Sequence, residues 1–175
     1  MQMSILRFEF DKLVTLLGRS EHDPEITNFF GRYMSNIGRD EYYGFLEFKP
    51  DGVAVVFNEA PWVISAKEIT DPHELYLIAF HLYREGYEGY AGYSGQLPHG
   101  VVMGDPEARV LSKMGQPSER GGGNVMPVLN RPVANWLRYP FGDATLRFQL
   151  DENGCVQMAT LAAATFNQRS GGGNQ

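Results

Sequence analysis

The sequence predicts an α+β protein in which an antiparallel sheet carries helices packed on one face. Three observations lead to this prediction. Segments 10–17 and 105–115 have the spacing of short amphipathic helices, whereas several other segments alternate as strands do. The order helix, glycine stop, strand, acidic turn and strand occurs in both parts of the chain. We therefore expect two related helix-plus-sheet halves.

The first half begins with two predicted helices, over 10–17 and 24–37, each followed by a glycine. The period then changes, and "YYGFLEFKPDGVAVVF" predicts a hairpin whose turn contains Pro50-Asp51-Gly52. A third strand is expected over 62–69. The segment 75–83 fits either a helix or a strand, and its aromatic and β-branched residues favour the strand.

The second half begins with a helix for which Asp105 is the predicted N-cap, Pro106 the first residue and Gly115 the stop. The stretch "SERGGGNVMPVLNRP" is expected to be a flexible loop. Three strands follow at 135–141, 144–150 and 155–163.

The two halves agree in detail around their hairpins. "LEFKPDGVAVVF" is parallel to "LRFQLDENGCVQM", and the stop glycines Gly18 and Gly115 lie 34 and 39 residues before the turn glycines Gly52 and Gly154 (52−18 and 154−115). We divide the chain into four parts accordingly. These are a degenerate first repeat at 1–86, a Gly/Tyr connector at 87–104, a second repeat at 105–167 and a disordered tail at 168–175.

Composition and charge exclude several classes of function. The chain of 175 residues is 43% hydrophobic, which is typical of a globular protein, and its single cysteine, Cys155, fits a reducing compartment. A net charge of −6 argues against a nucleic-acid ligand and favours a basic partner. No apolar run is long enough to span a membrane, and the first residues lack the pattern of a secretory signal. We therefore expect a cytoplasmic protein that does not bind membranes.

No catalytic motif or cofactor motif stands out. The histidines lack metal-ligand spacing, and a metal site from His73, Glu74 and His81 is less favoured than ordinary packing. Ser94 lies outside a nucleophile elbow, and the "GGGN" stretch is not followed by the residues of a phosphate loop. We therefore predict a protein that is not an enzyme, with no cofactor, no metal and no small-molecule substrate.

The Gly/Tyr connector is the most distinctive segment. Tyr87, Tyr90 and Tyr93 recur at every third residue, with glycines between them. Tyrosines offer a large amphipathic contact area, and glycines let the backbone adapt, as in recognition loops. The alternative is a connector whose tyrosines pack on the sheet, and both interpretations can hold together.

The second part of the chain contains one extended pattern. It consists of Gly92-Tyr93-Ser94-Gly95-Gln96-Leu97-Pro98, then Gly104-Asp105, Val110-Leu111, Gly115-Gln116-Pro117, a Trp/Tyr strand and "MATLAA". This pattern resembles immunity proteins encoded beside bacterial antagonistic toxins. It is also similar to the helix-plus-sheet repeat of β-lactamase-inhibitor-like and small outer-membrane-lipoprotein domains. The resemblance covers 92–161, with 10–69 as a degenerate copy in which Gly18-Arg19-Ser20 replaces Gly-x-Pro. It implies a protein without catalytic residues that binds and blocks another protein. No lipoprotein cysteine lies near the start, so an outer-membrane assembly role is not supported.

We predict an immunity protein that occludes the active site of a cognate toxin used in interbacterial competition, such as a type VI secretion effector. The expected partner-binding residues are aromatic anchors and acidic residues that steer a basic partner. They are Asp40, Glu41, Trp62, Tyr87, Glu88, Tyr90 and Tyr93. The alternatives are an effector-loading adaptor or chaperone and, less favoured, a small ligand-binding protein or enzyme.

Overall fold

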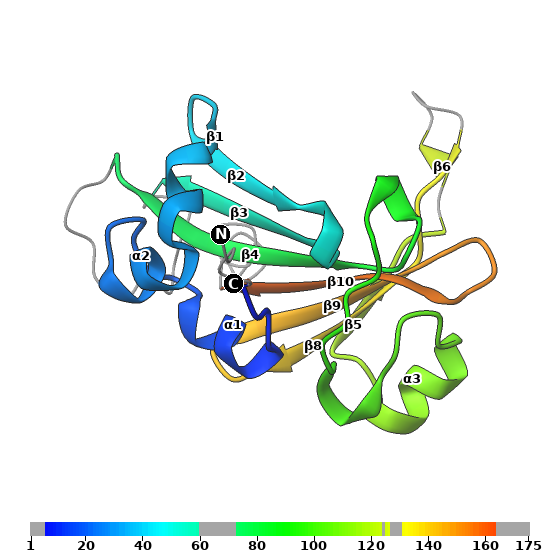
Figure 1. The fold of residues 1–175 in the computed structure, drawn as a ribbon. Helices are drawn as coiled ribbons and strands as arrows, with labels where there is room; N and C mark the ends of the chain where they lie inside the picture. Colours follow the sequence, from blue (N-terminus) through cyan, green and yellow to red (C-terminus); the bar gives the residue numbers. More distant parts are fainter. Residues whose placement is uncertain (1–5, 60–72, 124, 127–130, 164–175) are drawn as a thin grey trace, which may run out of the picture.

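The protein has an α+β fold, described here from a computed structural model for residues 6–59, 73–123, 125–126 and 131–163 (Figure 1). This part of the chain contains short helices and an eight-stranded antiparallel sheet. The helical elements are α1 (Phe10–Leu16), α2 (Pro24–Phe30), η1 (Gly31–Asn36), η2 (Lys49–Asp51), η4 (Tyr87–Gly89), η5 (Pro98–Gly100) and α3 (Glu107–Met114). The strands are β1 (Gly38–Arg39), β2 (Tyr43–Phe48), β3 (Val53–Glu59), β4 (Leu75–Tyr83), β5 (Glu119–Gly121), β6 (Val125–Met126), β7 (Arg131–Pro132), β8 (Trp136–Phe141), β9 (Ala144–Leu150) and β10 (Val156–Ala163).

The strand order of the large sheet is β1-β2-β3-β4-β10-β9-β8-β5, and every neighbouring pair is antiparallel. In the middle of the sheet β4 pairs with β10, with Leu82 opposite Ala159 and Phe80 opposite Leu161. The segment 75–83 is thus a strand, as its aromatic and β-branched content predicts. It pairs on both sides, which explains why almost every residue in it is buried.

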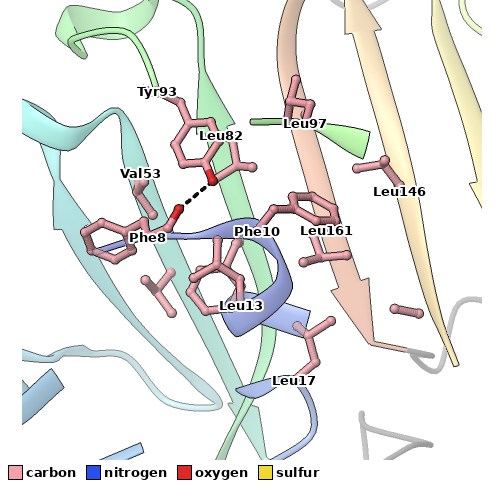
Figure 2. Packing of buried hydrophobic residues seen from close by; sticks show 14 of the residues in the cluster. Phe8, Phe10, Leu13, Leu17, Val53, Leu82, Tyr93, Leu97, Leu146 and Leu161 are labelled. Carbon is pink, nitrogen blue, oxygen red and sulfur yellow. Dashed lines mark hydrogen bonds between the residues drawn. The ribbon is translucent and has the colours of Figure 1, made fainter. Parts of the chain in front are cut away.

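The strand registers separate the sheet into two faces. Facing residues on six strands form a row of buried apolar side chains, namely Leu46, Val55, Phe80, Leu161, Leu146 and Tyr139. We call the face that carries them the first face. These residues belong to the main hydrophobic cluster, which also contains Leu13 of α1, Ile26 of α2 and Val110 of α3. Figure 2 shows part of this cluster, with Phe10 and Leu13 of α1 among strand residues.

Two predicted helices have different bounds in the structure. Asp23 caps α2 as its sequence pattern predicts, since its Oδ1 accepts from the Glu25 N–H at 2.8 Å. The prediction of one continuous helix over 24–37 is wrong, because Gly31 adopts φ +55°, α2 ends at Phe30 and a 3₁₀ helix follows. Asp105 is not the N-cap of α3. Pro106 takes that position, and the Asp105 carboxylate is buried against Lys113 Nζ at 2.8 Å.

The hairpins and loops also test the sequence interpretation. The predicted turn after β2 is confirmed, with Gly52 in the left-handed region at φ +70°. The prediction of a flexible loop over 118–132 is wrong in part, since β5 pairs with β8, and β6 pairs with β7. The strand predicted at 62–69 and the tail at 168–175 lie outside the described residues. No helix among the described residues is long and apolar enough to cross a membrane.

Candidate functional site

The second face of the sheet, opposite the first, carries the candidate site. One row of facing residues crosses it from β2 to β5 and consists of Glu47, Ala54, His81, Thr160, Arg147, Arg138 and Glu119. On β2, β3, β4, β10, β9 and β8 each of these positions is adjacent to a member of the apolar row, and successive strand residues point to opposite faces. Apart from Ala54, the row is polar or charged, so the sheet places a line of polar side chains on one side and a hydrophobic core on the other.

A cluster of two arginines and a tryptophan occupies the β8–β9 side of this face. The Cζ atoms of Arg138 and Arg147 lie 5.0 Å and 5.8 Å from the centre of the Trp136 ring. Arg138 donates to Glu119 Oε2 at 2.7 Å. The Arg147 side chain, which is half-buried, forms no ion pair or hydrogen bond with the residues that the structure describes. Burial and the neighbouring Arg138 lower the pKa of the Arg147 guanidinium.

A stack of tyrosines lies on the same face beside the β2–β4 side. The Tyr83 ring is stacked with Tyr90 at 4.0 Å and with Tyr87 at 5.6 Å between ring centres. The Tyr90 hydroxyl donates to Glu47 Oε1 at 2.8 Å, and Gln149 Nε2 donates to the Tyr87 hydroxyl at 3.2 Å. Burial, with smaller contributions from nearby acidic residues, raises the pKa of Tyr83 to about 12, so the Tyr83 phenol stays neutral near pH 7.

His81 lies at the centre of the polar row, between the tyrosine stack and the arginines. Its Nδ1 is 2.8 Å from Thr160 Oγ1. Burial and, to a smaller extent, the positive charge of Arg147 lower the pKa of His81 to about 4. The imidazole is therefore neutral at pH 7, and one of its nitrogens bonds the hydroxyl of the neighbouring strand.

Exposed aromatic side chains extend the second face at its β2 end. Tyr43 and Phe45 are 41% and 43% exposed and stack on each other at 6.4 Å between ring centres. In the same neighbourhood a groove of about 640 Å³ follows β2 and is lined by Tyr33, Phe45 and Asp51, among others. Burial raises the pKa of Asp51. Large exposed aromatics on a regular strand are typical of contact surfaces.

The structure distributes the predicted partner-binding residues over several environments. Asp40 and Glu41 are exposed between β1 and β2, and a hydrogen bond with Tyr43 lowers the pKa of Asp40. Glu88 is exposed at φ +49°. Tyr87 is half-buried in the stack on the second face. Trp62 lies outside the described residues.

The other two tyrosines of the connector are buried on opposite faces. Tyr90 is 5% exposed in the stack, whereas Tyr93 is 9% exposed in the core of the first face. Figure 2 shows Tyr93 directed at the Phe8 main-chain oxygen, to which its hydroxyl donates. The connector thus packs on the sheet, as the second sequence interpretation proposes, and of its tyrosines Tyr87 retains the most exposure.

The sequence analysis did not predict partner-binding roles for Trp136, Arg138, Arg147, Tyr43 or Phe45. The alternation of "NWLRYPF" and "ATLRFQL" contains a signal for them, since Trp136 and Arg138 share one face of their strand and Arg147 and Gln149 share one face of theirs. Among the described residues, no group of three or more His, Cys, Asp or Glu side chains could hold a metal ion. His81 bonds Thr160, and His73 lies 3.8 Å from Glu59.

Comparisons with known proteins assign this chain neither to a family nor to a function. No protein-family model and no curated sequence matches this chain. The chain is similar in structure to an extracellular protein containing a SCP domain from Bacillus anthracis str. Ames, with TM-score 0.49 and 10% identity over 93% of this chain and 50% of that chain. It is also similar to a DUF4309 family protein from Bacillus subtilis subsp. subtilis str. 168, with TM-score 0.43 and 13% identity over 81% of this chain and 78% of that chain. The chain thus spans half the length of the first protein, and both scores are too low to support a functional argument.

Proposed function

We propose that this protein is an immunity protein that binds a cognate bacterial toxin in the cytoplasm through the second face of its sheet. One observation carries the proposal. Aromatic and arginine side chains that retain exposure, among them Tyr43, Phe45, Trp136 and Arg147, lie on one face of a single continuous sheet. These residue types dominate the energetics of protein interfaces, and a sheet presents them with little entropy left to lose.

The proposal includes a duplicated architecture. In chain order, α1 and α2 precede the meander β1-β2-β3-β4, and α3 precedes the meander β5-β8-β9-β10. The last strands of the two meanders pair in the middle of the sheet. We therefore regard 1–86 and 105–167 as related repeats with their helices on the first face, joined by the connector at 87–104.

The proposed mechanism is occlusion. A broad sheet face that covers the active site of a toxin blocks substrate access and needs no chemistry of its own. Affinity would come from the aromatic and arginine side chains, and Asp40 and Glu41 at the rim would mainly raise the association rate.

The test is co-expression with each toxin encoded next to the gene for this protein. We expect restored growth, co-purification of the toxin, and at least about tenfold weaker binding for Phe45→Ala. Val102→Ala is the matched control, since Val102 is 55% exposed but lies in the loop before α3. Binding without restored growth would favour the adaptor alternative. No binding to any neighbouring toxin would refute the proposal.

A second candidate function is the binding of a small apolar ligand. The groove of about 640 Å³ beside β2 has the size of many ligand sites, and aromatic side chains line it. A thermal-shift screen with small aromatic acids tests this candidate. A rise in Tm that Tyr33→Ala abolishes would support it, and no rise with any compound would exclude it for that class.

A further inference from the structure

We infer that Arg147, with Arg138 and Trp136, forms a site that receives a carboxylate side chain of the protein partner. The inference rests on the proposed function, because it assumes that a protein covers the second face. It adds the chemistry that the partner must present at one defined point of the interface.

Two neighbouring arginines on the second face are paired unequally. Arg138 and Arg147 face each other across β8 and β9, and both guanidinium groups lie near the Trp136 ring. Arg138 has an acidic partner, since it donates to Glu119 at 2.7 Å. Within the described part of the chain Arg147 has none, although a guanidinium carries five N–H donors.

This arrangement of the arginines has an energetic cost in the free protein. Arg147 is half-buried beside a like charge, and on its other side it faces the Thr160 hydroxyl, which bonds the neutral His81. Desolvating a cation without a counter-charge is unfavourable. A carboxylate docked against the guanidinium supplies two acceptor oxygens in a matching bidentate geometry and removes that cost.

The charges around Arg147 favour a carboxylate over a phosphate as the bound anion. Glu119 already neutralises Arg138, which leaves about one positive charge for the incoming group. A single carboxylate matches this charge, whereas a phosphate dianion would face the Glu119 carboxylate with an excess negative charge. The surroundings, Trp136, Met158 and the Gln149 amide, have the mixture of apolar and polar groups found at protein hot spots.

The inference also predicts the charge pattern of the partner. Asp40 and Glu41 at the β1–β2 end are exposed acids, whereas Arg147 on β9 is a cation. A complementary partner therefore has basic residues opposite the β1–β2 turn and an acidic residue opposite β9. The net charge of −6 alone indicates only the first of these.

The first experiment measures toxin binding by variants of equal charge. We expect Arg147→Gln to weaken binding at least about 30-fold, and Arg32→Gln, which removes an exposed charge from η1, to change it less than about twofold. Arg147→Glu should regain affinity when one acidic residue of the toxin interface is replaced by Lys. Equal binding by wild type and Arg147→Gln would overturn the inference while the proposed function stands.

The second experiment needs no toxin, so it separates failure of the site from failure of the proposed function. The full chain is titrated with sodium glutarate, with inorganic phosphate and with sodium chloride at equal ionic strength, and the Arg147 Nε–Hε resonance is followed by NMR. We expect a saturable shift with glutarate that Arg147→Gln abolishes, and a raised His81 pKa in the bound state. An equal response to all three salts, or tighter binding of phosphate, would overturn the carboxylate assignment.

Stability provides a third readout. Because Arg147 is unfavourable in the free protein, Arg147→Gln should fold with a Tm equal to or above that of wild type. A large loss of Tm would identify Arg147 as a structural residue and contradict the inference.

Discussion

The two ends of the second face differ in how completely their polar groups are paired. At the β2–β4 end, Tyr90 bonds Glu47 and packs on Tyr83, so polar and aromatic groups satisfy one another. At the β8–β9 end, Arg138 is paired, but Arg147 has no acidic partner among the described residues. Polar groups that pair with one another stabilise the fold. A buried charge without a counter-charge costs stability, and it is retained where a binding partner supplies the missing group. We therefore expect mutations in the paired tyrosine stack, at Tyr83 or Tyr90, to change folding, and mutations of Arg147 to change binding.

The largest loss of stability should come from a substitution at Gly52, where the connector crosses the end of the sheet. A Cβ at Gly52 would lie 2.4 Å from the Ala91 oxygen and 2.5 Å from the Tyr93 nitrogen, and its φ is +70°. Gly52→Ala should lower the free energy of unfolding by more than about 3 kcal/mol, because the φ angle is unfavourable for alanine and because backbone atoms of the connector must move to admit the Cβ. Urea unfolding measures this change.

Gly86→Ala is the matched control for this variant. Gly86 has φ +88° but nothing within 4 Å of the added Cβ, so the cost should be about 1 kcal/mol from the dihedral alone. Equal losses for the two variants would mean that the close approach at Gly52 does not matter.

The next largest effect should be a dependence of stability on pH that comes from His81, which lies between the two ends of the second face. Its pKa is about 4 in the folded protein and 6.5 in the unfolded chain, so the unfolded state binds more protons between these values. Stability should therefore be full above pH 6.5, fall as the pH decreases towards 4 and lose about 3 kcal/mol in total from this group. The measurement is urea unfolding at a series of pH values, compared with His81→Gln.

The His81→Gln variant cancels the contributions of other titrating groups, and its amide can still bond Thr160. The difference in free energy of unfolding between wild type and His81→Gln should decrease as the pH falls from 6.5 to 4. Arg147→Gln should reduce this difference, because it removes a positive charge that lowers the His81 pKa. A flat difference across the range would contradict the prediction.

The smallest loss of stability should come from removing one hydrogen bond at the β2–β4 end. Tyr90→Phe removes the hydrogen bond to Glu47, which has exposed side-chain atoms and can turn to water, so the loss should be about 1 kcal/mol. For a chain of this length that corresponds to a fall in Tm of roughly 2–4 °C by calorimetry. Tyr42→Phe, whose hydroxyl donates to Glu41 on the exposed turn, should change Tm by less than about 1 °C. A larger effect for Tyr42→Phe than for Tyr90→Phe would reverse the assignment of the tyrosine stack as structural.

Much of the local structure follows from the sequence pattern. The alternation in 144–150 predicts β9 and places Arg147 on the face opposite Leu146. The turn at Gly52 and the cap at Asp23 also follow from residue type. The helix over 24–37 does not, because its apolar spacing continues past Gly31 while the backbone leaves the α region there.

The candidate site was harder to predict, since its members are far apart in the chain. His81 and Thr160 are separated by 79 residues and meet because β4 pairs with β10. Tyr90 and Tyr93 are three residues apart, and equal spacing indicates one shared surface. In the structure the connector runs close to Gly52, and the two rings lie on opposite faces of the sheet.

The sequence by itself determined the long strands β2, β3, β8, β9 and β10, the turns between them and which side chains share a face within each, because alternation and turn preferences act over a few residues. Only the tertiary structure decided which strands are neighbours, and therefore that Arg147 lies beside Arg138 and Thr160 with no acidic partner in the described part of the chain. Strand pairing is set by burial of the whole apolar row at once. That is a property of the assembled sheet, and no single segment contains it.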